Sequence, residues 1–155
     1  MNRHSICWCA LAMAMVGCSS GDTAPTPPSA SATIDITGTW VQEGADRREW
    51  SLTQSGIVAG GAASFAEQNS PTIGAVSGTG GVQGAVFSGM FRFAETYETL
   101  SIPAQPSPNY CSSDTDGQLA ISGSGSTMTG SYTETIGCAG VHVSQVTRSL
   151  VMRRR

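Results

Sequence analysis

The sequence predicts an all-β domain, an antiparallel meander that closes into a small barrel of about eight strands. Convincing helical periodicity is absent, and the 19 glycines of the chain recur too often for long helices, because each costs about 1 kcal/mol relative to alanine in a helix interior. Alternation of apolar and polar residues, the period of a strand with one buried face, runs through most of the chain instead. A repeated unit of strand, glycine turn and strand indicates successive hairpins.

Residues 1–17 are predicted to be an export signal. A short basic stretch precedes an apolar run from Ile6 to Val16, which is shorter than the roughly 20 residues of a membrane-spanning helix. The run ends in Met15-Val16-Gly17-Cys18, which resembles the lipobox of bacterial lipoproteins. This resemblance implies that Cys18 carries acyl chains such as palmitate and that the protein is anchored in the cell envelope, with Ser19 directing it to the outer membrane. The alternative is an ordinary signal peptide that contains a stray cysteine.

Residues 18–34 are predicted to be the lipidated cysteine and a tether. From Ser19 the chain reads SSGDTAPTPPSASAT, which is poor in apolar residues and typical of a disordered linker. We expect this tether to hold the folded domain away from the bilayer, although a proline-rich ligand for another protein is an alternative. The remaining residues 35–155 have the length of one domain.

The cysteines beyond the signal predict one disulfide. With Cys18 acylated, Cys111 and Cys138 remain, and an even pair in an oxidising envelope usually forms a disulfide. A two-thiolate metal site is the alternative, but zinc normally takes four ligands, and His142 is the one histidine beyond the signal. We therefore predict no metal and no cofactor.

Charge excludes nucleic acid as a partner. Only 12% of residues are charged and the net charge is −3, whereas nucleic-acid binding generally needs clustered basic residues on one face. The terminal Arg153-Arg154-Arg155 run is interpreted as a solvated, fraying end. Contact with acidic lipid head groups or surface polysaccharide is the alternative. We expect a monomer.

The strands are assigned from the alternation of apolar and polar residues. In one predicted strand, for example, Tyr132 and Glu134 lie in phase with Ile136, opposite a ladder of threonines and serines. Closing the meander into a barrel removes exposed sheet edges, and a β-sandwich is the alternative. The predicted strands span 39–43, 48–55, 57–64, 72–79, 84–94, 96–102, 117–122 with 126–136, and 141–152.

The first predicted strand carries a family resemblance. Its sequence, Ile36-Thr-Gly-Thr-Trp40, resembles the opening of the calycin barrels, the lipocalins and avidins. The resemblance implies that Trp40 plugs the closed end of the barrel and that an arginine from the last strand packs across it, with Arg148 as the candidate. Biotin binding is not implied, because only Trp40 and Trp50 remain beyond the signal. The Trp-x-Leu-x-Gln-x-Gly pattern from Trp50 also resembles small uncharacterised bacterial lipoproteins of this architecture.

No catalytic constellation is evident, and we predict that the protein is not an enzyme. Ser112, Ser113 and Asp114 lie near Cys111 but have no second histidine to complete a triad. The stretch Asp114-Thr-Asp116-Gly117 resembles a fragment of a calcium loop, yet it lacks the distal bidentate glutamate. It is therefore interpreted as an Asx turn.

A long loop is the predicted lid of the barrel. Residues 103–117 contain three prolines and Tyr110, and loops of this length in compact domains are usually functional or disordered. A disulfide to Cys138 would pin this loop across one end of the barrel. Tyr110 is therefore a candidate recognition residue.

Two functions follow from the predicted barrel. In the first, a lipid-anchored lipocalin-like barrel binds a small apolar or amphipathic molecule in its lumen, which the many alanines and glycines would leave open. In the second, the barrel is filled by its own side chains, and its outer loops contact an envelope protein or a glycan. The candidate ligand-binding residues are Trp50, Leu52, Phe87, Phe91, Phe93, Met128, Tyr132, Glu134 and Tyr110.

Overall fold

The computed structural model describes residues 33–70, 73–104, 110–139 and 141–155. The predicted signal, Cys18 and most of the predicted tether lie outside the described residues. None of the described residues belongs to a helix long and apolar enough to span a membrane.

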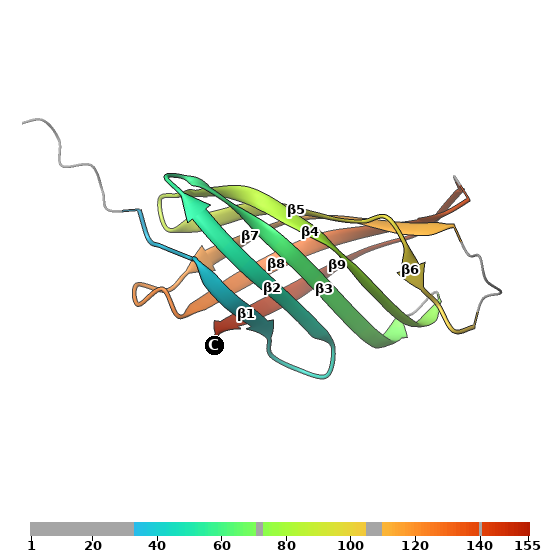
Figure 1. Cartoon of the computed structure of the whole chain (residues 1–155). Helices are drawn as coiled ribbons and strands as arrows, with labels where there is room; N and C mark the ends of the chain where they lie inside the picture. The colour runs from blue at the N-terminus through green and yellow to red at the C-terminus, as the bar shows by residue number, and fades with distance from the viewer. Residues whose placement is uncertain (1–32, 71–72, 105–109, 140) are drawn as a thin grey trace, which may run out of the picture. The chain divides into compact units, whose positions relative to one another are not determined.

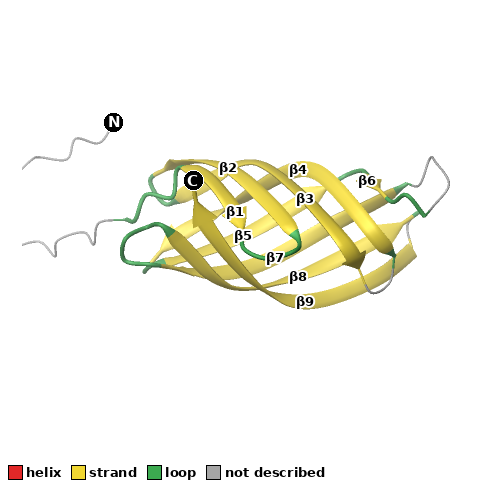
Figure 2. Ribbon diagram, turned by 90° about the horizontal axis from the view of Figure 1, so that it is seen from below, coloured by secondary structure: helices red, strands yellow, loops and turns green. Residues whose placement is uncertain are grey.

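The described chain forms a closed antiparallel barrel of eight strands with one additional short strand (Figure 1). The sheet runs from β3 through β2, β1, β9, β8, β7 and β5 to β4, and a direct pairing of β3 with β4 closes it. Figure 2 shows the strands wrapping around a common interior. The predicted barrel is thus confirmed over the sandwich. The strands are β1 (Gly38–Gln42), β2 (Arg47–Ser55), β3 (Val58–Ser70), β4 (Gly74–Phe87), β5 (Met90–Tyr97), β6 (Leu100–Ser101), β7 (Cys111–Ile121), β8 (Thr127–Cys138) and β9 (Val141–Arg154).

A tight turn divides the predicted strand 84–94 into β4 and β5. Ser88 and Gly89 both have positive φ, 49° and 73°, which is the geometry of the two-residue turn that joins twisted antiparallel strands. The turn places Phe87 opposite Met90. The side chain of Phe87 is 46% exposed, so its predicted place in the lumen with Phe91 and Phe93 is wrong.

The predicted lid is shorter than its sequence indicates, because β7 already begins at Cys111. Asp114 and Asp116 lie within β7, paired with Thr135 and Thr133 of β8. The Asx turn is therefore wrong, since these residues are in regular strand. Within the rest of that loop, residues 105–109 lie outside the described residues.

The disulfide between Cys111 and Cys138 is confirmed. The two cysteines are directly opposite each other on β7 and β8. The bond therefore links neighbouring strands where they begin and end, and it does not pin a loop across the barrel as predicted.

Trp40 of β1 packs inside the barrel beside the last strand. Its side chain is fully buried, and its Nε1 donates a hydrogen bond to the Ile36 carbonyl at 2.8 Å. The arginine that packs across its ring is Arg154, whose Cζ lies 5.1 Å from the ring centroid. Arg148 was the wrong candidate, because Arg154 is the residue of β9 directly opposite Trp40.

The terminal arginine run is part of the barrel rather than a fraying end. Arg153 pairs with Glu43, and the Arg154 guanidinium donates to the Asp35 carbonyl. The backbone nitrogen of Arg155 donates to the Thr39 carbonyl at 2.9 Å. Strand β9 therefore stays paired almost to its last residue.

Inward-facing glycines make room for aromatic rings. A Cβ built on Gly117 would lie 2.5 Å from the Phe93 ring, and one built on Gly84 would lie 2.7 Å from the Phe91 ring. A Cβ on Gly78 would meet the Phe65 ring at 2.9 Å. The prediction that glycines leave the lumen open is therefore wrong, since the rings occupy the space.

Replacing Gly117 with alanine is expected to destabilise the barrel by about 1–3 kcal/mol, the usual cost of overpacking a core. The added methyl group would also lie 2.9 Å from the Ser131 carbonyl oxygen, which cannot move without disturbing β8. Urea unfolding measures the loss. Gly123→Ala is the control, because a Cβ there meets nothing within 4 Å. Equal stability of the two variants would contradict this account of the core.

Candidate functional site

An arginine and two glutamates meet inside the barrel. Arg48 of β2, Glu95 of β5 and Glu134 of β8 are all at most 3% exposed. Arg48 Nη1 lies 2.6 Å from Glu95 Oε2, and Arg48 Nη2 lies 3.7 Å from Glu134 Oε1. Trp50 Nε1 donates a hydrogen bond to Glu95. The Ser113 hydroxyl donates another to Glu134 at 3.1 Å. We call Arg48, Glu95 and Glu134 the charged cluster.

Aromatic rings enclose the guanidinium of this cluster. The Arg48 Cζ lies 4.3 Å from the centroid of the Tyr132 ring and 5.6 Å from that of Phe65. A cation held over aromatic faces is attracted by their quadrupole, and more so when water is excluded. The rings therefore help to compensate Arg48 for its loss of solvent.

A second ion pair joins β9 to β3. Arg148 of β9 places Nη1 2.6 Å from Glu67 Oε2 of β3 and 3.9 Å from Asp46. The Glu67 side chain is 4% exposed, whereas that of Arg148 is 20% exposed. Arg148 thus belongs to this ion pair and does not contact Trp40 as expected.

Burial shifts the acid-base behaviour of both pairs. Burial raises the pKa of Glu95 above its usual range and outweighs the opposing effects of the Arg48 charge and of the hydrogen bond from Trp50. Burial and the nearby Glu134 likewise raise the pKa of Glu67, although Arg148 lowers it. For Arg48, burial lowers the pKa, but Glu95 and the other neighbours outweigh this effect and raise it.

Seven of the nine predicted ligand-binding residues point into the barrel, where they fill it. Each of these seven is at most 4% exposed. Their rings pack directly on one another, since the centroid of Trp50 lies 4.9 Å from that of Phe93 and 6.1 Å from that of Phe91. The seven are Trp50, Leu52, Phe91, Phe93, Met128, Tyr132 and Glu134.

The other two predicted residues, Phe87 and Tyr110, are exposed on the outside of the barrel. Tyr110 is 76% exposed and precedes β7. Glu134 does lie on the inward face, as predicted, and Arg48 lies beside it. The alternation that places Trp50 and Leu52 inside also includes Arg48, which the sequence analysis missed.

The wall of the barrel splits between β6 and β7. Strand β7 pairs with β5 as far as Tyr97, opposite Ser113, while β6 pairs with Ser77 and Gly78 of β4. Among the described strands β6 has no second partner, so it forms an edge.

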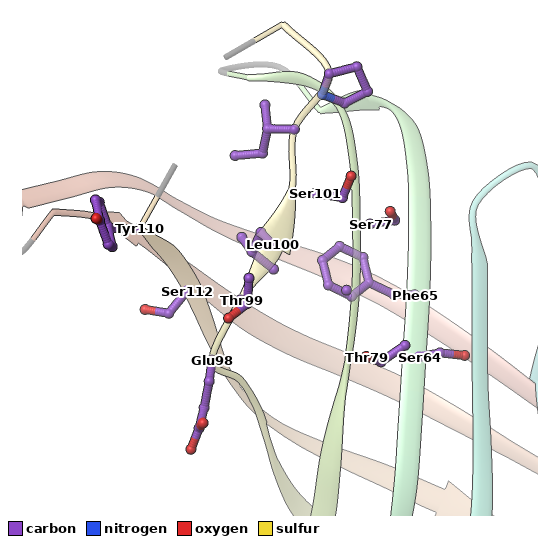
Figure 3. A pocket seen from close by; sticks show the side chains of 13 residues that line it. Ser64, Phe65, Ser77, Thr79, Glu98, Thr99, Leu100, Ser101, Tyr110 and Ser112 are labelled. Carbon is purple, nitrogen blue, oxygen red and sulfur yellow. The ribbon is translucent and has the colours of Figure 1, made fainter. Parts of the chain in front are cut away.

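An open groove of about 1060 Å³ crosses this split. Figure 3 shows Tyr110 and Ser112 on one side of β6, and Ser77 and Thr79 on the other. Phe65 and Leu100 are buried beneath it. We call this hollow the β6–β7 groove. It is lined by Ser64, Phe65, Ser77, Gly78, Thr79, Glu98, Thr99, Leu100, Ser101, Ile102, Pro103, Tyr110 and Ser112.

The groove is rich in hydroxyl groups and nearly free of charge. Its described lining contains one carboxylate, that of Glu98, and no arginine. Within the described ranges, no three histidine, cysteine, aspartate or glutamate side chains group closely enough to hold a metal ion. The groove therefore offers hydrogen bonds and apolar contacts rather than ionic ones.

Replacing Arg48 with methionine is expected to lower the free energy of unfolding by about 3–5 kcal/mol, because Glu95 and Glu134 would remain buried without a cation. Urea unfolding followed by tryptophan fluorescence measures the change. The neighbouring Arg47→Met is the control, since the Arg47 side chain is 69% exposed and surface changes usually stay within about 0.5 kcal/mol. A loss below about 1 kcal/mol in Arg48→Met would rule out the structural role given to the cluster.

Stability is expected to fall as pH rises above about 4.5, in part because of Glu67. Its pKa is raised above 4.5 in the folded state, so the folded protein holds this proton more tightly than the unfolded chain does. The contribution is complete below the unfolded-state pKa and is lost as pH rises through the folded-state pKa. Glu67→Gln should flatten this part of the pH profile of unfolding. Parallel profiles for wild type and Glu67→Gln would disprove the assignment.

No protein-family model, curated protein or solved structure matches this chain. Fold and site therefore rest on the chain's own residues and geometry.

Proposed function

We propose that this chain is a lipid-anchored protein of the bacterial envelope that binds a neutral, hydroxyl-rich ligand, a glycan, in the β6–β7 groove. The lipobox-like sequence ending at Cys18 supports the anchor and the location. The closed barrel acts as a rigid support for the groove and has no catalytic part.

The packed interior is the observation that carries this proposal. Seven of the nine predicted ligand-binding side chains are at most 4% exposed. Their rings pack on one another and on the charged cluster. An eight-stranded barrel is just wide enough for its own side chains to fill it. A filled barrel favours recognition at the outer surface over the lumen binding of a small apolar ligand.

The chemistry of the groove indicates the class of ligand. Its volume of about 1060 Å³ is at the upper end of ligand pockets, which span roughly 300–1,000 Å³. Hydroxyl groups along its rim can both donate to and accept from the hydroxyl groups of a sugar. Tyr110 offers an exposed ring on which the apolar face of a sugar can stack, with its hydroxyl left free for water or ligand.

The charge of the groove lining favours a neutral glycan over an anionic one. Glu98 is the one charged residue in the described lining, and it is exposed. Without a nearby cation, a phosphate or carboxylate group would be repelled and would have no partner. Neutral sugars and amino sugars therefore fit the groove better than acidic polysaccharides.

Tyr110→Ala is expected to weaken binding of a neutral oligosaccharide about tenfold or more, since a loss of about 1.4 kcal/mol corresponds to tenfold. Calorimetric titration with chitohexaose, cellohexaose and maltohexaose measures it, with polygalacturonate as the anionic comparison. Phe87→Ala removes another exposed ring, at the far end of β4, and should leave the affinity unchanged.

Three results would refute the glycan proposal. They are the absence of binding to every neutral oligosaccharide, tighter binding of polygalacturonate, and an equal loss of affinity in Tyr110→Ala and Phe87→Ala. A small apolar molecule that stays bound to the protein in native mass spectrometry would instead favour the lumen.

A further inference from the structure

Exposed apolar side chains gather at the end of the barrel opposite the groove. Ile57, Val58 and Phe87 are 57%, 61% and 46% exposed. They lie on two neighbouring turns, β2–β3 and β4–β5, which are joined by a hydrogen bond from the Val86 backbone nitrogen to the Ile57 carbonyl at 2.7 Å. Val58 of β3 is paired with Ala85 of β4. We call Ile57, Val58 and Phe87 the apolar tip.

The polypeptide enters the barrel beside this tip (Figure 1). The Ile36 backbone nitrogen donates to Gln54 Oε1 at 2.8 Å, and Gln54 Nε2 donates to the Gly56 carbonyl at 2.9 Å. Gln54 thus ties the incoming segment to the β2–β3 turn that carries Ile57. Any tether between Cys18 and Thr33 must therefore leave the barrel from the apolar tip's own end.

The charges near the tip suit an anionic surface. The Arg92 Cζ lies 5.6 Å from the Phe87 ring centroid, and the side chain is exposed. The exposed Arg155 ends the chain at the same end, beside Thr39. Asp35 is an exposed carboxylate there, hydrogen-bonded to the Thr37 backbone nitrogen at 2.8 Å. An exposed cation, Arg92, thus lies directly beside an apolar side chain of the tip, as cations do in segments that lie at membrane interfaces.

We propose that the apolar tip rests on the surface of the bilayer that holds the lipid on Cys18, with Ile57, Val58 and Phe87 among the lipid head groups and Arg92 at their phosphates. This inference rests on the proposed lipid anchor. The 15 residues from Ser19 to Thr33 have the composition of a linker, and linkers of this length span roughly 20 Å. They would hold the tip at a high effective concentration near the bilayer, so that a weak contact suffices.

The contact would set the orientation of the barrel. A lipid on a flexible tether fixes the distance from the membrane but leaves the domain free to turn. The other turn at this end, from Ser122 to Ser126, contains only serines and glycines. The barrel would therefore tilt so that the apolar tip faces the lipid. The β6–β7 groove, at the opposite end of the barrel, would then face away from the membrane.

The experiment uses the full-length gene product purified from membranes, with Phe87→Trp as the probe and Tyr110→Trp as its matched control. Each is reconstituted into phosphatidylethanolamine–phosphatidylglycerol vesicles whose lipids carry brominated chains, and the quenching of tryptophan emission is measured relative to wild type. We expect the tryptophan at position 87 to be quenched several-fold more than the one at 110. Adding Ile57→Ser and Val58→Ser should abolish this difference.

Flotation of the same vesicles separates this inference from the anchor. If the protein floats with the vesicles but positions 87 and 110 are quenched equally, the anchor stands and the tip contact is refuted. If wild type does not float, the anchor fails and the inference fails with it. Unquenched emission from position 87, together with a dimer in sedimentation that Ile57→Ser disrupts, would show that a second copy covers the tip instead.

Discussion

The burial of Arg48 between Glu95 and Glu134 constrains the rest of this structure. A guanidinium buried in a barrel is stable only while its carboxylate partners and the rings stacked on it stay in place, because a buried charge without partners is strongly destabilising. The three side chains come from β2, β5 and β8, and no two of these strands are neighbours in the sheet. The charged cluster therefore fixes the register of three strands relative to one another, which apolar packing alone does less specifically. Such a network favours one arrangement of the barrel, and it leaves little space for a guest molecule.

Much of the fold could be predicted because alternation directly reports which face of a strand is buried. The inward set of β8, which includes Tyr132 and Glu134, followed from this period alone. Trp40 followed from its resemblance to a known opening, and the disulfide from the count of cysteines. Phe87 was misplaced because Ser88 takes a positive φ that is uncommon in residues other than glycine. One undetected turn changed the face of the residue before it.

The functional features were harder to predict, because they depend on pairs of residues from distant strands. Nothing in the sequence says that Arg48 meets Glu95, since the register between β2 and β5 follows from barrel closure. The prediction that glycines leave the lumen open was wrong for a related reason. Whether the space beside Gly117 stays empty depends on Phe93, which lies on the neighbouring strand. The groove arises where β6 and β7 part, and no local pattern marks that point.

Strand β6 has a consequence for how copies of the barrel can associate. A closed barrel has no free backbone edge, so its copies cannot add strands to one another. Here β6 leaves a free edge on one side, and this edge is two residues long. Proline follows it at position 103, and the carboxylate of Glu98 precedes it. So short an edge, bounded by a charge and a residue without an amide hydrogen, is a poor template for sheet extension. Copies of the barrel would thus have little means of joining through β6.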